Sequence, residues 1–142
     1  MKIKKYVGIA KTVDDSPIPR RLNVIKINMN QTRKLKENER VLIEFMLEKI
    51  SLTIQDYPIA EDVFEYEGGK MGSISLGIDN NPDDYDGDLI QLQYTDTDGI
   101  AVIITLTRNN KNQLLDLDFW KEDFSKLITY PTPDKVIVKE IS

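Results

Sequence analysis

The segment from Asp79 to Asp88 holds the densest group of side chains that could do chemistry. It reads DNNPDDYDGD and contains five aspartates. Calcium is bound by several carboxylate oxygens, and the usual calcium loop places aspartates at positions 1, 3 and 5, glycine at 6 and glutamate at 12. With Gly87 as the sixth position, Pro82 occupies the first and Gln93 the twelfth. The spacing therefore favours an acidic loop, either solvated or used for recognition, over a calcium site.

A second group of carboxylates lies near the single tryptophan and consists of Asp116, Asp118, Glu122 and Asp123, of which Asp116, Asp118 and Glu122 are the candidates for chemistry. Paired carboxylates can act as general acid and base, and with a metal ion they could form a small metal-dependent enzyme site. However, Asp116 and Asp118 alternate along a predicted strand, on the face where exposed carboxylates are common. We expect no catalytic residue, no metal and no other cofactor, and we keep the enzyme as the alternative.

Two residue types are missing from the sequence, histidine and cysteine. Without histidine, the chain can form neither Ser-His nor Cys-His nucleophile pairs, and it cannot bind zinc through imidazole. Without cysteine, it can form no disulfide and no catalytic thiolate. Catalysis would have to depend on carboxylates, lysine, tyrosine or a metal ion held by oxygen ligands.

The charge balance is acidic, with 19 basic and 24 acidic side chains and a net charge of −5. Such a balance argues against nonspecific binding of nucleic acid, which requires a basic face, and is compatible with a basic protein partner. No apolar run approaches the length of a membrane span. The apolar stretch Tyr6–Ala10 is too short for the core of a signal peptide. We therefore expect a cytoplasmic protein.

Three apolar-rich segments between Asp88 and Phe124 predict an antiparallel meander with strands at 89–95, 100–107 and 113–119. A three-residue loop at Thr97–Gly99 pairs Tyr94 with Val102, Leu92 with Ile104 and Ile90 with Leu106. A two-residue turn would set Leu92 against Thr105. The three-residue loop is favoured because a slip of one residue would move the apolar set to the other face.

The second turn of the meander is predicted as a two-residue turn at Asn110-Lys111. It pairs Leu106 with Leu115, Ile104 with Leu117 and Val102 with Phe119. Nine apolar side chains then share one face. The other face carries Gln91, Gln93, Thr105, Thr107, Asp116 and Asp118, with Ile103 as its main apolar member. One face is thus core and the other is mostly solvated.

Residues 37–50 show the apolar spacing of a helix, which is expected to cover the apolar face of the meander. The fold class is therefore α+β: an antiparallel meander sheet with one main helix packed on one face. Further strands are expected near the N-terminus, over Leu22–Met29, in a hairpin at 60–67 and 71–78 that pairs Phe64 with Ile74 or Ser73, and over Val136–Ile141. The aromatic residues Trp120 and Phe124 are expected to pack on the core, and residues 1–142 to form a single domain.

Several short motifs resemble a family of small uncharacterised bacterial domains. They are Arg33-Lys34-Leu35, Glu39, Leu42-Ile43, Met46-Leu47, Gly69-Lys70-Met71-Gly72-Ser73, Asp98-Gly99 and the segment LDLDFWKEDF at 115–124. That family has an Arg-x-Leu helix, a Gly-Gly-Met-Gly-Ser turn and a Leu-Asp-x-Trp-Lys-x-Asp-Phe segment. This chain differs by placing Lys70 between the glycines and Met71. The resemblance covers about residues 33–130, which leaves 1–32 as an N-terminal extension.

The resemblance and the acidic charge together indicate a binding protein. Small acidic domains of this sort often accompany toxin genes, so the resemblance implies an immunity protein that neutralises a cognate basic toxin, such as a nuclease, by direct contact. The predicted contact residues are Asp83, Asp84, Tyr85, Asp86 and Asp88, with Tyr85 as the aromatic anchor. We expect neither nucleic acid nor membrane as a partner. A regulatory or structural subunit that binds through Gln91, Gln93 and Asp116 is a further alternative.

Overall fold

The computed structural model describes residues 2–7, 9–10, 32–66, 70–77 and 81–141. The chain divides into two compact units, Met1–Gln31 and Thr32–Ser142. In the first unit, strand β1 (Lys2–Val7) pairs with β2 (Ile9–Ala10), in the region where an N-terminal strand is expected. The strand predicted over Leu22–Met29 lies outside the described residues. That residues 1–142 form a single domain stays a prediction.

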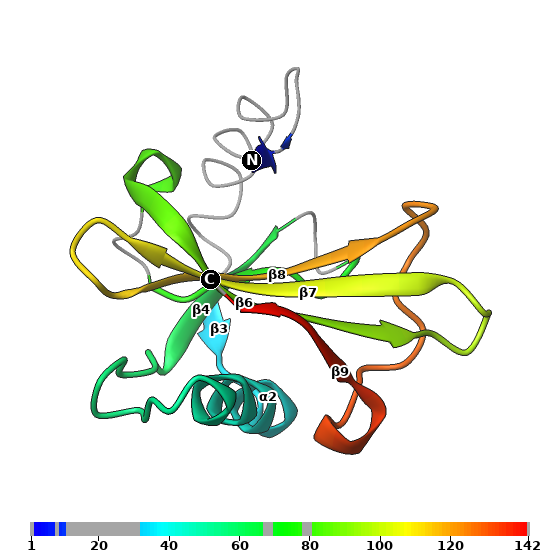
Figure 1. The fold of residues 1–142 in the computed structure, drawn as a ribbon, viewed down its shortest axis with the longest axis horizontal. Helices are drawn as coiled ribbons and strands as arrows, with labels where there is room; N and C mark the ends of the chain where they lie inside the picture. Colours follow the sequence, from blue (N-terminus) through cyan, green and yellow to red (C-terminus); the bar gives the residue numbers. More distant parts are fainter. Residues whose placement is uncertain (1, 8, 11–31, 67–69, 78–80, 142) are drawn as a thin grey trace. The chain divides into compact units, whose positions relative to one another are not determined.

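The second unit contains a seven-stranded sheet in the order β3-β4-β5-β8-β7-β6-β9, with every neighbouring pair antiparallel (Figure 1). The strands are β3 (Thr32–Lys34), β4 (Asp62–Glu65), β5 (Ile74–Ser75), β6 (Tyr85–Thr95), β7 (Ala101–Asn109), β8 (Leu114–Lys121) and β9 (Ile137–Ile141). Two short 3-10 helices, η2 (Pro82–Asp84) and η3 (Pro133–Lys135), precede β6 and β9. The predicted α+β class is confirmed.

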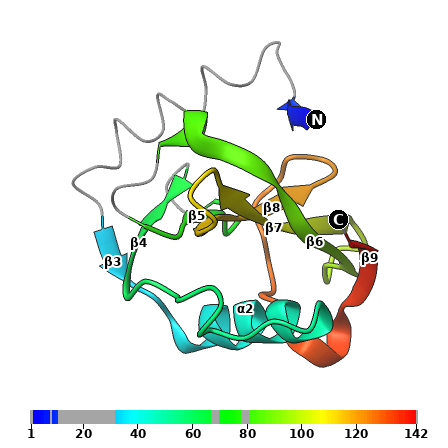
Figure 2. The ribbon, with the colours of Figure 1, turned by 60° about the vertical axis from the view of Figure 1, so that its left-hand side comes forward.

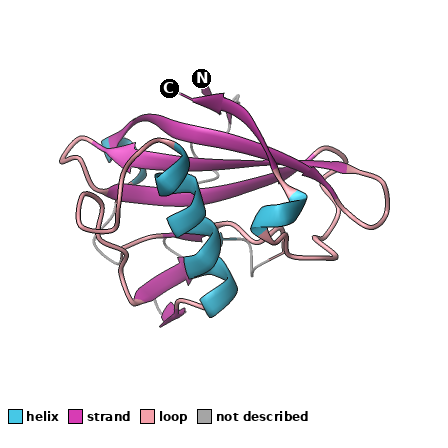
Figure 3. Cartoon of the chain, turned by 60° about the horizontal axis from the view of Figure 1, so that its bottom comes forward, coloured by secondary structure: helices cyan, strands magenta, loops and turns pink. Residues whose placement is uncertain are grey.

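Helix α2 (Glu37–Lys49) lies across one face of this sheet (Figures 2 and 3). Its N-terminus is closed by Glu39, whose carboxylate accepts a hydrogen bond of 2.9 Å from the backbone N–H of Lys36. Such a cap satisfies a donor that has no partner inside the helix. The helix buries Leu42, Ile43, Met46 and Leu47 in one core with apolar side chains of the central strands. The predicted helix and its role as a cover are confirmed.

The predicted register of the first hairpin of the meander is confirmed. Tyr94 pairs with Val102, Leu92 with Ile104 and Ile90 with Leu106. The loop has three residues between Asp96 and Ile100, because the N–H of Asp96 donates to the carbonyl of Ile100 at 2.9 Å. Gly99 has a φ of 82°, a left-handed conformation that glycine adopts without a steric penalty.

The predicted register of the second hairpin is wrong by two residues. Leu106 pairs with Leu117, Ile104 with Phe119 and Val102 with Lys121. One residue of the shift comes from the turn, which has three residues because the N–H of Asn109 donates to the carbonyl of Gln113. The other comes from a bulge on β8 between the pairs Arg108–Leu114 and Leu106–Leu117. Leu114 therefore joins the core in place of Leu115, and Lys121 enters the core face.

For the outer strands, the local sequence pattern alone does not determine the pairing register or every strand. The hairpin of β4 and β5 pairs Phe64 with Ser75 and Glu65 with Ile74, so neither of the two predicted registers is right. Strand β3 was not predicted, because three residues are too few to show an alternation. The last strand is present as β9, which pairs with β6 at the edge of the sheet.

Candidate functional site

The acidic segment Pro82–Asp88 has a fixed backbone. The side chain of Asn81 accepts a hydrogen bond of 2.9 Å from the N–H of Asp83 and so caps η2. The carbonyl of Asp84 accepts one of 2.8 Å from the N–H of Asn110. Sequence reasoning treated the segment to Asp88 as a loop, but β6 already begins at Tyr85. The acidic side chains are therefore held on regular structure.

The five predicted contact residues lie together because they are consecutive or nearly so along η2 and β6. Asp83 and Asp86 are exposed, and Asp84, Tyr85 and Asp88 are partly buried. The hydroxyl of Tyr85 donates to Asp88 at 2.6 Å. Within the described part of the chain, the segment has one ion pair, between Asp86 and Arg108 at 3.7 Å. That these residues contact a partner stays a prediction.

The carboxylates named for an enzyme site have separate environments. Asp116 is buried and accepts a hydrogen bond of 2.7 Å from the hydroxyl of Tyr66. Asp118 accepts one of 3.2 Å from Ser73, and Glu122 is exposed. Among the described residues, no group of three or more carboxylate, imidazole or thiol side chains is placed to hold a metal ion.

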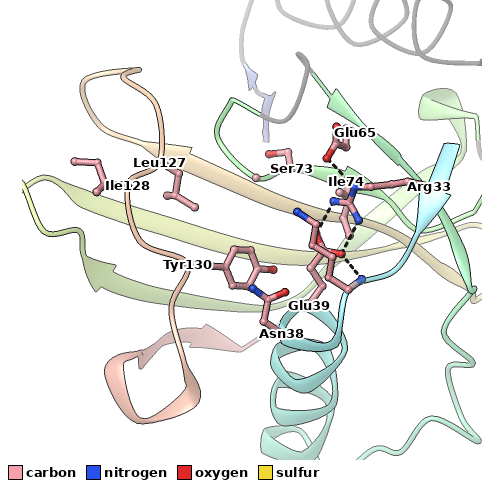
Figure 4. A pocket seen from close by; sticks show the side chains of 11 residues that line it. Arg33, Asn38, Glu39, Glu65, Ser73, Ile74, Leu127, Ile128 and Tyr130 are labelled. Atoms are coloured by element: carbon pink, nitrogen blue, oxygen red, sulfur yellow. Dashed lines mark hydrogen bonds and ion pairs between the residues drawn. The ribbon is translucent and has the colours of Figure 1, made fainter. Parts of the chain in front are cut away.

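A small pocket of about 200 Å³ lies where β3, α2 and the segment after β8 meet (Figure 4). Arg33 lies at its wall and binds two carboxylates: Glu39 through two bonds of 3.0 and 2.7 Å, and Glu65 through one of 2.7 Å. The hydrogen bonds to Glu39, which is almost fully buried, are the main cause of a raised pKa for Arg33, with burial opposing and Glu65 adding to the rise. Arg33 thus connects β3 to α2 and to β4 through charge-assisted hydrogen bonds.

Two further features complete this pocket. Tyr130 lies on its wall with its ring centroid 5.2 Å from that of Phe119, and its hydroxyl has no hydrogen-bond partner among the described residues. Burial raises the pKa of this phenol. Gly72 has a φ of 94°, and a Cβ there would lie 3.4 Å from Leu127. The two carboxylates that line the pocket, Glu39 and Glu65, are both bound by Arg33.

A buried charge cluster lies at the tip of the first hairpin. The ammonium group of Lys121 is fully buried and donates to Asp98 at 2.7 Å, to Asp96 at 2.9 Å and to the carbonyl of Lys126 at 3.0 Å. Burial opposes this charge, but the hydrogen bonds to Asp98 and Asp96 outweigh it and raise the pKa of Lys121. The cluster fastens the segment after β8 to the hairpin tip.

The aromatic residues Trp120 and Phe124 do not pack on the core as predicted. Trp120 is 48% exposed and Phe124 is 58% exposed, and their rings meet edge to face with centroids 6.1 Å apart. Trp120 lies directly opposite Ile103 of β7, on the sheet face away from α2. The physical reason is strand alternation: because Phe119 points into the core, its neighbour on β8 must point out.

The sequence matches one protein family, and the comparisons with curated proteins and with solved structures found no match. The family described as a domain of unknown function, DUF6984, matches residues 32–131. The chain belongs to this family. Residues 1–31 and 132–142 lie outside the matched range. In the described part, no helix has the length and apolar character needed to cross a membrane.

The motifs on which the resemblance was based meet in the DUF6984 domain at two places. Arg33, Glu39, Gly72 and Ser73 line the pocket, while Asp98 and Lys121 share the buried charge cluster. Sequence reasoning missed both. The spacing of Arg33 and Glu39 gives no signal, since the chain changes from strand to helix between them. The alternation of β8 did contain a signal, because it places Lys121 on the same face as Phe119.

Proposed function

We propose that this protein is an immunity protein, which binds a cognate basic toxin through its acidic segment and neutralises it by direct contact. The observation that carries the proposal is how the charges are distributed. Asp83, Asp84, Asp86 and Asp88 lie within six positions, and in the part of the chain described one ion pair is found among them, between Asp86 and Arg108.

Three basic side chains elsewhere in the domain are paired with carboxylates outside the acidic segment. Arg33 is held by Glu39 and Glu65, Lys34 pairs with Asp62 at 3.0 Å, and Lys121 is buried against two aspartates. In the acidic segment, Asp83 and Asp86 are exposed and place negative charge at the surface. Fields of this kind attract a partner of opposite charge and accelerate its association.

A toxin that acts on nucleic acid fits this surface best. Nuclease clefts are positively charged because they bind phosphates, and carboxylates on a fixed backbone can occupy the positions of those phosphates. The caps and hydrogen bonds of η2 and β6 reduce the entropy that would be lost when the segment is ordered on binding.

The test uses two variants with the same change in charge. Asp83→Asn/Asp86→Asn neutralises two exposed carboxylates of the segment, and Glu44→Gln/Glu48→Gln neutralises two on the exposed side of α2. A tagged wild-type chain captures its partner from cells of the native organism, and the partner is then identified by mass spectrometry. The captured protein is next expressed in a host together with each form of the chain.

We expect the captured protein to stop growth, the wild type to restore growth and the helix variant to restore it equally well. The segment variant should restore growth poorly and should associate with the partner more slowly. Failure of the wild type to rescue growth, or equal rescue by both variants, would contradict the proposal.

A further inference from the structure

Among the exposed large hydrophobic side chains in the described part of the chain, Trp120 and Phe124 are the two aromatic ones, and they form a pair. Both rings are about half exposed, and Ile103 lies beside Trp120 on the neighbouring strand. Single exposed apolar residues are common, but an aromatic pair with a β-branched neighbour is typical of interfaces.

The pair is held in place before any partner binds. Phe124 has a φ of 62°, and its N–H donates to the carbonyl of Lys121 at 2.9 Å. The side chain of Asp123 accepts from both the N–H and the hydroxyl of Ser125, at 3.0 and 2.6 Å, which closes the turn. An ordered aromatic surface loses little conformational entropy on binding, which favours its use as an anchor.

The surroundings of the pair are acidic. Asp118 and Glu122 lie two residues before and after Trp120 on β8 and its extension, and Asp123 adjoins Phe124. The one cation among these residues, Lys121, points to the opposite face and is fully buried. Lys126 is exposed two residues beyond Phe124, but no cation stacks on Trp120 among the described residues, where the cation–π contact found is that of Lys49 with Phe45.

We infer that the Trp120–Phe124 surface is a docking site for an arginine side chain carried by a basic protein partner. Arginine fits better than lysine, because a planar guanidinium can stack on an indole ring while it donates several hydrogen bonds to carboxylates. The inference rests on the proposed function in that it names the residue with which the basic partner binds. It also assigns the role of aromatic anchor to Trp120 and not to Tyr85. The hydroxyl of Tyr85 is already hydrogen-bonded to Asp88.

The experiment uses Trp120 as its own reporter, because the chain has no other tryptophan. The emission of the full chain is titrated with amidated hexa-arginine, hexa-lysine and hexa-glutamate peptides at low and moderate ionic strength. We expect a saturable change with hexa-arginine, about threefold tighter than with hexa-lysine, and none with hexa-glutamate.

Three variants make the test specific. Glu122→Gln/Asp123→Asn should weaken hexa-arginine binding by about tenfold, since two nearby charges are lost. Phe124→Ala should weaken it about threefold, and its circular dichroism should match the wild type because the ring lies outside the core. Asp83→Asn/Asp86→Asn, at the other end of β6, should leave the Trp120 titration unchanged.

The inference is overturned if emission shows no saturable change, if hexa-lysine matches hexa-arginine, or if Glu122→Gln/Asp123→Asn binds like the wild type. The proposed function can fail separately, through a captured partner that the chain does not neutralise. Conversely, a partner that is neutralised but dissociates from Phe124→Ala at the wild-type rate would leave the proposed function standing and refute this docking site.

Discussion

Replacing Asp96 by asparagine should reduce stability by an amount that depends on pH. The Asp96 carboxylate accepts hydrogen bonds from Lys121 at 2.9 Å and from the N–H groups of Thr97, Ile128 and Thr129 at 2.8, 2.8 and 3.0 Å. Burial alone would raise its pKa, but the N–H of Ile128, the ammonium of Lys121 and the two other N–H groups outweigh burial and lower the pKa to about 2. The native state therefore favours the ionised form.

The size of the effect follows from this depression of the pKa from 3.8. At about 1.4 kcal/mol per pKa unit, ionised Asp96 contributes at most about 2 kcal/mol to the free energy of unfolding at neutral pH. Because the folded pKa is the lower one, the unfolded chain binds the proton first as pH falls. The contribution is complete above about pH 5 and is lost between about pH 4 and pH 2.

Urea unfolding followed by circular dichroism at pH 7, 5, 3 and 2 measures this contribution. The difference in the free energy of unfolding between wild type and Asp96→Asn should be about 2 to 3 kcal/mol at pH 7 and should shrink by about 2 kcal/mol towards pH 2. Lys121→Met should cost about 3 kcal/mol at pH 7, since it leaves two carboxylates without their cation. A difference between wild type and Asp96→Asn that is the same at pH 7 and pH 2 would refute the role of the Asp96 charge.

Three other outcomes are expected. Leu117→Asp should unfold the domain in circular dichroism, because Leu117 is fully buried and a charge there would have no partner. Arg33→Met should lower the free energy of unfolding in urea by about 3 kcal/mol, since it leaves buried Glu39 beside Glu65 with no cation; a loss below about 1 kcal/mol would contradict a structural role. In stopped-flow measurements with the captured toxin, Asp83→Asn/Asp84→Asn should slow association, and the loss should shrink as salt rises; an unchanged association rate would mean that the segment is merely solvated.

The features predictable from sequence are those fixed by regular spacing over many residues. Helix 37–49 shows its buried stripe directly, and the register of β6 with β7 follows from alternation on both strands with a glycine in the turn. The register of β7 with β8 depends on a turn whose asparagines allow either two or three residues. The side chain of Asn109 accepts from the N–H groups of Lys111 and Gln113, at 2.9 Å each, and so favours the longer loop.

The candidate binding surface was only partly predictable. The sequence shows which residues are acidic or aromatic, but it does not show which of them lie at the surface or close together in the fold. The acidic segment can be recognised from the amino-acid sequence alone. The exposure of Trp120 required the alternation of β8 to be given more weight than the tendency of tryptophan to pack on a core. Predicting the pocket around Arg33 required tertiary contacts between residues 33, 39 and 65, which local patterns do not contain.

The buried lysine links the stability of the fold to the character of its surface. If Lys121 were exposed, it would lie beside Glu122 and Asp123 and neutralise part of their charge. Its withdrawal to Asp96 and Asp98 leaves the Trp120–Phe124 surface acidic, and its bond to the carbonyl of Lys126 holds the segment that follows this surface. The cost of burying the ammonium is offset by three hydrogen bonds at the hairpin tip. The same ion pairs that fasten this end of the sheet therefore also determine the charge that a basic partner would meet there.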